Sequence, residues 1–327
     1  MANVVITGAT GFVGGAAWRH FRNSGWHVTA VGRRPAIDSH NYICQDLAQT
    51  FCPELLAAVD RADVVIHAAA RSSPWGSFQS FQRDNVLATQ KLIDTCEQYG
   101  QPKLIYISSG SVYYRPSDQW DLREDAILPQ RFINHYARTK RIGEQLVQRY
   151  RGRAMILRPR AIYGVGDFVL FPRILKSVQA GKFPLIVRPE KPVIGDLVSI
   201  DHLVECLLIA AQREALEGIY NITDGQPVEV IPFLLSVLEQ LELPLPQKKI
   251  KVTTALRIAR TVELIYGTLI PWREPPITRF GVHVFAYSKT FDVTKMRKDF
   301  GDPKVDTQQV VSQFVQWVKR ENPYELS

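Results

Sequence analysis

The sequence predicts an α/β protein with a doubly wound parallel sheet and a smaller, discontinuous C-terminal domain. Apolar strand-like runs alternate with amphipathic helical segments in the first half, a glycine-rich turn joins the first such pair, and the pattern becomes irregular and proline-rich after "IYGVGD". Alternation of this kind is typical of parallel strands joined by helical crossovers. We expect residues 1–167 and 196–223 to form the larger domain, and residues 168–195 and 224–327 the smaller one.

The expected elements follow in a regular order. The strand "NVVITG" precedes the helical segment "AAWRHFRNSG" and the strand "HVTAVG". Further strands are expected at "ADVVIHAA", "KLIYISS" and "AMILRPR", with helices at "NVLATQKLIDTCEQYG" and around "YARTKRIGEQLVQRY". Regular structure resumes with "LVSIDHLVECLLIAAQ" and "GIYNITDG".

Composition excludes several classes of protein. Hydrophobic residues at 46% and charged residues at 22% indicate an ordinary globular chain. The four cysteines form no Cys-x-x-Cys pair, so neither a disulfide framework nor a metal site is predicted, and a cytoplasmic location is expected. The net charge is +8, but the basic residues are scattered, which argues against a nucleic-acid partner. We see neither a secretory signal nor an apolar run of the ~18 residues needed to cross a bilayer.

The sharpest motif is the turn "TGATGFVG", which contains Gly8, Gly11 and Gly14 and also Phe12 and Val13. Glycines allow the backbone to turn tightly and to approach a pyrophosphate, whose charge is met by helix N-terminal amides. The alternative is that these glycines only let the helix pack closely on the strand. Because the turn directly follows an apolar strand, we favour a Rossmann-like dinucleotide site.

The end of the second strand indicates which dinucleotide binds. An acidic residue there would bond a ribose hydroxyl, whereas an arginine would accept a 2′-phosphate. Gly32 stands where the acid would be, and Arg33 and Arg34 follow it. The sequence therefore favours NADP(H) over NAD(H), unless these arginines are merely solvated loop residues.

Two tyrosine-lysine pairs have the same spacing of four residues. Tyr99 and Lys103 are separated by "GQP", so their side chains need not meet, whereas Tyr136 and Lys140 lie in a segment that favours a helix. A nearby ammonium lowers the pKa of a phenol, so that Tyr136 could donate a proton to a ketone that receives hydride. Serines at the end of the preceding strand could bond the substrate oxygen, and the candidates are Ser108, Ser109 and Ser111.

These motifs, with "HAAA", "NVLAT", "SSGSVY", "YARTK" and "RPRAIYGVGD" in order, resemble the extended short-chain dehydrogenase/reductase family over nearly the whole chain. The resemblance implies that Ser109 acts with Tyr136 and Lys140, and that Lys140 also bonds the nicotinamide ribose. It further implies a cofactor site with Asp46 and Leu47 near the adenine, the His67 to Ala70 loop (including Ala68 and Ala69) along the cofactor, Asn85 in support and Pro159 near the nicotinamide.

The C-terminal segments "EPPITRFGV" and "FAYSKTFDVTKMRKDFGDPKVD" resemble the branch of 3β-hydroxysteroid dehydrogenases, sterol-4α-carboxylate 3-dehydrogenases and 2-alkyl-3-oxoalkanoate reductases. Nucleotide-sugar epimerases and dehydratases are the competing branch. They commonly carry an arginine before the acidic residue that corresponds to Asp196, where this chain has Ile194 and Gly195. They also often carry a glycine after the Val-Tyr pair, where this chain has Tyr114, and both departures count against a diphosphate substrate. Ala88 and Val165 also depart from family patterns, which affects the expected loop geometry and substrate fit.

Residues 253–272, "TTALRIARTVELIYGTLIPW", predict a helix with one narrow polar stripe formed by Arg257, Arg260 and Glu263. Such a helix could pack on a core, line an apolar cavity or rest on a membrane surface. We therefore expect an NADP(H)-preferring oxidoreductase for a small hydrophobic substrate, a 3-oxo acid or a steroid-like molecule. A homodimer and peripheral membrane contact are further hypotheses, and a non-catalytic dinucleotide sensor is the alternative outside enzymes.

Overall fold

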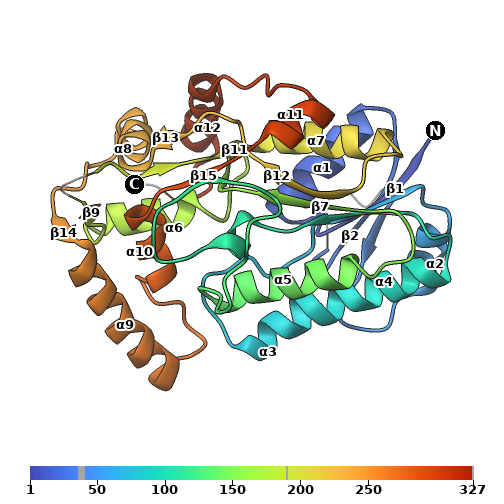
Figure 1. Cartoon of the computed structure of the whole chain (residues 1–327), viewed down its shortest axis with the longest axis horizontal. Helices are drawn as coiled ribbons and strands as arrows, with labels where there is room; N and C mark the ends of the chain where they lie inside the picture. The colour runs from blue at the N-terminus through green and yellow to red at the C-terminus, as the bar shows by residue number, and fades with distance from the viewer. Residues whose placement is uncertain (36–40, 189–190, 326–327) are drawn as a thin grey trace.

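The computed structural model describes residues 1–35, 41–188 and 191–325, and its centre is a seven-stranded parallel sheet (Figure 1). The strand order is β12-β7-β5-β4-β1-β2-β3. The strands are β1 (Asn3–Thr7), β2 (His27–Gly32), β3 (Tyr42–Cys44), β4 (Val64–His67), β5 (Lys103–Ile107), β7 (Ala154–Pro159) and β12 (Gly218–Ile222). The order reverses between β1 and β4, and such a switch point leaves a crevice at the carboxyl ends of the strands.

Helices cover both faces of this sheet. On one face lie α1 (Phe12–Asn23), α7 (Ile200–Gln212) and α11 (Thr294–Phe300), and on the other lie α2 (Pro53–Asp60), α4 (Ala88–Gln98) and α5 (His135–Val147). Successive strand residues point to opposite faces, so Val4 and Ile6 pack with Phe21 under α1, while Val5 packs with Leu55 under α2. The predicted doubly wound fold is confirmed.

One helical element spans residues 78–98 without interruption. It consists of α3 (Phe78–Phe81), the π-helical turn η1 (Gln82–Leu87) and α4. A π-turn holds one residue more than the α-helical path needs and is frequent at functional sites. Here it carries Asp84 and Asn85, and both are buried.

The remaining elements form a smaller unit against the carboxyl ends of the strands. It contains a sheet of order β13-β10-β15-β6, with β6 (Gln119–Leu122), β10 (Ile194–Gly195), β13 (Val228–Glu229) and β15 (Lys289–Phe291). Two strand pairs are β8 (Ile162–Tyr163) with β11 (Val198–Ser199), and β9 (Leu185–Val187) with β14 (Lys249–Lys251). Helices α6 (Phe171–Gln179), α8 (Val230–Gln240) and α12 (Thr307–Glu321) share one apolar core.

The sequence did not anticipate that β6, from the first part of the chain, pairs with β15 near the C-terminus. The short 3-10 turn η2 (Gly110–Tyr113) lies between β5 and β6. The boundaries between the two domains remain a prediction.

The predicted helix in residues 253–272 is α9 (Val252–Leu269), which projects from the body beside α10 (Arg279–Ala286) (Figure 1). Only Ala255 and Ala259 of α9 are buried. Several large apolar side chains on or just after it are exposed, namely Ile258, Leu264, Ile265, Leu269 and Trp272. Within the described residues, no helix combines the length and apolar character required to cross a membrane.

Candidate active site

The glycine-rich turn joins β1 to α1 at the switch point of the sheet. Gly8 has a φ of +72°, and a Cβ there would lie 2.7 Å from the Ala69 nitrogen. A Cβ on Gly14 would lie 2.2 Å from the Gly8 oxygen, while Gly11 donates its N–H to that oxygen at 2.8 Å. Only glycine fits at Gly8 and Gly14, and the turn keeps the first N–H groups of α1 accessible to an anion. This cradle fits a dinucleotide pyrophosphate, with half-buried Phe12 and Val13 in the first turn of the helix.

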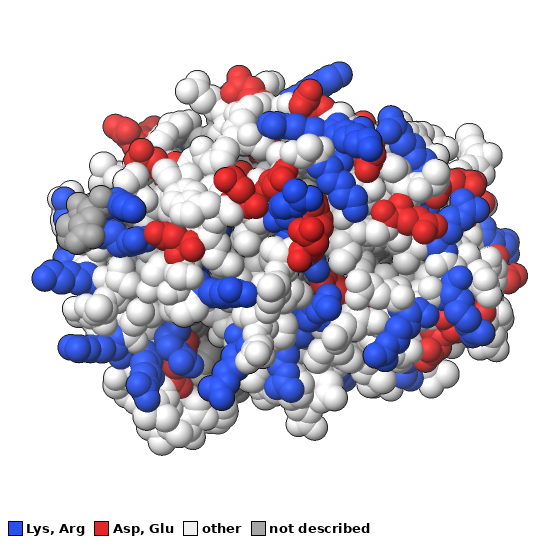
Figure 2. All heavy atoms as spheres, viewed as in Figure 1, with Lys and Arg blue, Asp and Glu red and all other residues white. Residues whose placement is uncertain are grey.

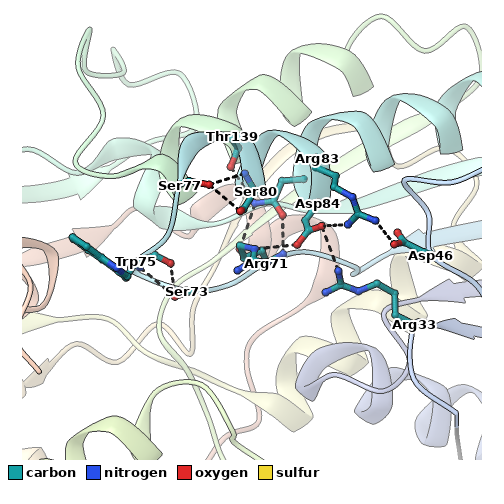
Figure 3. A network of polar contacts seen from close by, with 11 residues as sticks. Arg33, Asp46, Arg71, Ser73, Trp75, Ser77, Ser80, Arg83, Asp84 and Thr139 are labelled. Carbon is teal, nitrogen blue, oxygen red and sulfur yellow. Dashed lines mark hydrogen bonds and ion pairs between the residues drawn. The ribbon is translucent and has the colours of Figure 1, made fainter. Parts of the chain in front are cut away.

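Four arginines and two aspartates lie in the loops after β2, β3 and β4 and on η1, where the sequence predicts the adenosine end of the cofactor. Asp84 is buried and accepts from Arg33 at 3.3 Å, Arg71 at 2.9 Å and Arg83 at 2.7 Å (Figure 3). Arg83 also pairs with Asp46, which lowers the pKa of that carboxyl against the opposing effect of burial. Arg34 is exposed and contacts the Thr10 carbonyl at 3.4 Å. Among the described residues of this cluster, positive charge therefore exceeds negative charge by two, which suits a phosphate.

Leu47 is buried in the core, beside the half-buried Asp46. The ring of His67 is 1% exposed, and its nitrogens lie 2.7 Å from the Thr7 hydroxyl and 2.9 Å from the Thr89 hydroxyl. Burial, with the nearby Lys140 charge, lowers the pKa of His67 to about 3, so the ring is neutral. The His67 side chain thus supports β4 from inside and does not face a cofactor. Ala68 and Ala69 lie beside Gly8 of the glycine-rich turn and are better placed to contact a cofactor.

Asn85 connects three parts of the site from the buried side of η1. Its Oδ1 accepts the Arg71 N–H at 2.7 Å, and its Nδ2 donates to the Thr139 hydroxyl on α5 at 3.0 Å (Figure 3). It therefore fixes the loop after β4 against the helix that carries Tyr136.

Ser109, Tyr136 and Lys140 come together at the carboxyl end of β5. Tyr136 and Lys140 lie one turn apart on α5, and the Ser109 side chain lies close enough to the Tyr136 hydroxyl to lower the pKa of that phenol. The Lys140 ammonium is 2% exposed and donates to the Ile107 carbonyl at 2.6 Å. The other pair does not meet in this way, because Lys103 donates to carbonyls at the end of α7, 2.9 Å from Ala210 and 2.7 Å from Arg213. Only the pair on α5 is part of a site.

The serines of the same segment have different roles. Ser109 accepts the N–H of Ser111 at 3.2 Å, and their hydroxyls are 2.5 Å apart. Ser108 instead points away and donates to Glu144 at 2.6 Å in the interior. Among the three candidates, Ser109 is therefore the one whose side chain affects Tyr136.

Burial dominates the electrostatics of this site. It raises the pKa of Tyr136 against the opposing hydrogen bond from Ser109. It also lowers the pKa of Lys140 to about 7, although the Glu144 carboxylate opposes that shift. The expectation that Lys140 lowers the pKa of Tyr136 is not met in the chain alone. The charge of a positively charged nicotinamide would lower the pKa of Tyr136, which is the expected direction.

Beneath the site lies a buried ion-pair network that the sequence did not reveal. Glu144, one turn after Lys140, binds Arg158 of β7 through both oxygens, at 2.7 and 2.8 Å. Arg158 also contacts the Tyr113 hydroxyl, which donates to Asn221 at 2.9 Å. The sequence also missed Arg71, Arg83 and Asp84, although the run Arg83-Asp84-Asn85 directly precedes the "NVLAT" motif. Pro159 ends β7, and its carbonyl lies beside Gly110.

Comparison with known proteins assigns the chain to a family. Residues 4–223 match the model described as NAD dependent epimerase/dehydratase family. A 2-alkyl-3-oxoalkanoate reductase from Shewanella oneidensis is 27% identical, over 92% of this chain and 82% of the relative. A 3beta-hydroxysteroid-dehydrogenase/decarboxylase isoform 2 from Arabidopsis thaliana is 30% identical over 80% of this chain, which covers 48% of that longer protein.

Solved structures agree on the fold. MoeE5 in complex with UDP-glucose and NAD is 24% identical, with a TM-score of 0.76 over 98% of this chain and 100% of that one. A UDP-glucuronic acid 4-epimerase from Bacillus cereus in complex with NAD is 22% identical, with a TM-score of 0.71 over 98% of this chain and 99% of that one. The predicted family is confirmed. The chain belongs to the NAD dependent epimerase/dehydratase family of extended short-chain dehydrogenases/reductases and is an NAD(P)-dependent enzyme.

Proposed function

We propose that this enzyme is an NADP(H)-preferring oxidoreductase that interconverts a secondary alcohol and a ketone on a hydrophobic substrate. The observation that carries the proposal is that Ser109, Tyr136 and the buried Lys140 lie together at the carboxyl end of β5. When bound, the nicotinamide cofactor supplies or accepts the hydride. Ser109 would hold the substrate oxygen, and Tyr136 would deliver a proton to it or remove one from it. Lys140, positioned by the Ile107 carbonyl, would orient the cofactor ribose, and a positively charged nicotinamide would favour the phenolate of Tyr136.

The test of this mechanism is Tyr136→Phe, measured as NADPH oxidation with a panel of hydrophobic ketones. Turnover should fall below detection while NADPH binding, measured by fluorescence, is retained. Tyr99→Phe is the matched control, because that tyrosine also precedes a lysine by four residues but lies at the end of α4, outside the site. A Tyr136→Phe variant with near-normal turnover would show that another group handles the proton.

The preference for NADP(H) is supported by the surplus of arginines around Asp84 and Asp46. Arg33 and Arg34 are exposed after β2, and Arg83 is half-buried beside them, so all three could contact a 2′-phosphate. Replacing Arg33 or Arg83 with Ala should raise the KM for NADPH about tenfold or more and leave that for NADH nearly unchanged. Arg61→Ala, an exposed arginine after α2, is the control. A wild-type enzyme that prefers NADH would overturn this assignment.

The relatives and α9 support the proposed class of substrate. Two relatives are named 2-alkyl-3-oxoalkanoate reductase and 3beta-hydroxysteroid-dehydrogenase/decarboxylase, which favours a 3-oxo acid or a steroid-like substrate. The end of α9 contacts the loop after β4, since the Trp75 indole donates to the Pro271 carbonyl at 3.3 Å and packs beside Gly267. This contact brings apolar surface to the edge of the site. Selective retention and epimerisation of UDP-sugars would instead support the nucleotide-sugar branch.

We also propose peripheral contact of α9 with an anionic membrane surface on the cytoplasmic side. The exposed apolar side chains of α9 lie among exposed basic ones, Lys248, Lys249, Lys251, Arg257 and Arg260. Basic residues gather at the left and lower left of Figure 2, over β14 and α9. Binding to liposomes with anionic lipids should weaken as salt rises, and Leu264→Asp should reduce it further. A lack of binding at low salt would remove the membrane proposal without affecting the catalytic one.

A homodimer through α4 and α5 is a separate proposal. The outer face of α5 borders a hollow of about 600 Å³ lined by residues that include Leu128, Phe132 and Ile142. Ile127 beside it is 85% exposed. A second copy of the chain would cover these apolar groups. Light scattering should give twice the chain mass, and Ile142→Glu should yield a monomer; a monomeric wild type would refute the proposal.

A further inference from the structure

Two buried cations lie beside the candidate catalytic residues. Arg160 follows Pro159 at the end of β7, and Lys289 begins β15; they are 8% and 2% exposed. The Arg160 guanidinium carbon lies 5.2 Å and the Lys289 nitrogen 5.6 Å from the centre of the Tyr114 ring. Tyr114 ends the η2 turn that begins after Ser109. The two cations therefore face one tyrosine at the edge of the catalytic site.

Their charges lack a direct acidic partner. The Arg160 Nε is buried without a hydrogen-bond partner among the described residues. The Lys289 ammonium donates to the carbonyls of Ser117 at 2.5 Å and Ser288 at 3.2 Å, and in the described part of the chain neither cation forms an ion pair. A buried charge without a counter-charge is costly unless a ligand supplies one.

The nearby carboxylates are already engaged. Asp118 accepts from Arg188 at 2.6 Å. Asp196 accepts the Phe291 N–H at 2.8 Å and the Thr223 hydroxyl at 3.4 Å. A third carboxylate, Asp121, accepts from the Thr290 hydroxyl at 3.3 Å. Among the described residues none of these three carboxylates forms an ion pair with Arg160 or Lys289.

Two further observations fit a binding site. Burial and the neighbouring Arg160 charge lower the pKa of Lys289 to about 8, so that the two cations disfavour each other and an anion between them would relieve the repulsion. Ala161, directly after Arg160, has a φ of +44°, in the left-handed region that non-glycine residues rarely adopt. Strained backbone of this kind is typical of functional sites.

We propose that Arg160 and Lys289 bind the carboxylate of an oxo-acid substrate, next to the ketone or alcohol held by Ser109 and Tyr136. A carboxylate would supply the negative partner that neither buried cation has among the described residues, and its two oxygens match the fork of an arginine side chain. The inference rests on the proposed oxidoreductase function for the position of the reacting carbon, but the anion site itself can be tested without turnover.

The experiment is calorimetric titration of the full chain, with NADP⁺ present, by octanoate and by octanol. Octanoate should bind at least tenfold more tightly. Arg160→Met and Lys289→Met, which keep apolar stems against Tyr114, should each weaken octanoate binding about 10–100-fold, and Arg160→Lys should restore part of it. Lys103→Met is the matched control, because Lys103 is also a buried lysine and donates to carbonyls at the end of α7. Octanoate should bind this variant normally.

Equal affinity for octanoate and octanol would overturn the inference, whatever is found for ketone reduction. An equally large loss in Lys103→Met would also overturn it, since the effect would then be general. If UDP-glucose binds in a way that depends on Arg160 and octanoate does not bind, the site accepts a diphosphate and the carboxylate proposal is wrong. Arg160-dependent octanoate binding in an enzyme that reduces no ketone would support the anion site while refuting the proposed function.

Discussion

Glu144→Ala should destabilise the protein strongly, because Glu144 is the acidic centre of a buried network. Its side chain is 0% exposed, and its two oxygens bind Arg158, itself 2% exposed, at 2.7 and 2.8 Å. Ser108 donates to it at 2.6 Å and Arg141 at 3.0 Å. The substitution would leave the Arg158 charge in the core without its carboxylate.

The expected cost follows from these contacts. Removing one partner of a buried ion pair costs about 3–5 kcal/mol. Arg158 would keep the Tyr113 hydroxyl and the Glu124 carbonyl, at 3.1 Å, so we expect the lower end, about 3 kcal/mol. With a urea dependence of about 3 kcal/mol per molar, the unfolding midpoint should fall by about 1 M. Urea titration followed by circular dichroism measures this shift.

Glu97→Ala is the matched control for this substitution. Glu97 also binds an arginine through two contacts, Arg151 at 2.8 and 3.2 Å, but the Arg151 side chain is 73% exposed. Solvent stabilises both charges there, so the midpoint should move much less. If Glu144→Ala shifts the midpoint no more than Glu97→Ala, the reasoning from burial is wrong.

Three further changes test other parts of the structure. Gly14→Ala would place a Cβ 2.2 Å from the Gly8 oxygen, so NADPH binding should be lost, and a normal dissociation constant would contradict the proposed cradle. Gly267→Ala in α9 meets its nearest neighbour at 3.7 Å and should raise the free energy of unfolding by about 0.5–1 kcal/mol, whereas a loss would show strain that the geometry does not predict. His67, with a pKa of about 3 when folded and 6.5 as its ordinary value, takes up a proton more readily in the unfolded chain, so stability should fall by roughly 1.4 kcal/mol per pH unit as pH drops below 6.5. His67→Gln should make this acid slope shallower, and an unchanged slope would assign it to other groups.

The sequence was sufficient for the sheet and its helices because the signals there are local. Successive side chains of the strand "NVVITG" point into two different cores, and the glycine turn can be recognised from neighbouring residues alone. The pairing of β6 with β15 joins segments about 170 residues apart, and no local pattern encodes such a contact.

The site was partly predictable for the same reason. Tyr136 and Lys140 share a helix, so their spacing in the sequence predicted that they lie on one face. The proximity of Lys289 to Arg160 depends instead on the tertiary fold. His67 shows the opposite case, because a motif placed it near the cofactor while burial between Thr7 and Thr89 turned its ring inward.

The π-helical turn couples the placement of Asn85 to the helix that follows it. Because this turn holds one residue more than an α-helix needs, deletion of one residue from Gln82–Leu87 would allow a regular α-helix with α3 and α4 in their present places. Leu92 and Cys96 would then stay in the core, but Asn85 would shift and lose its bonds to Arg71 and Thr139. Chimeras and loop exchanges between homologues that cross this segment must therefore preserve its length, whatever their sequence.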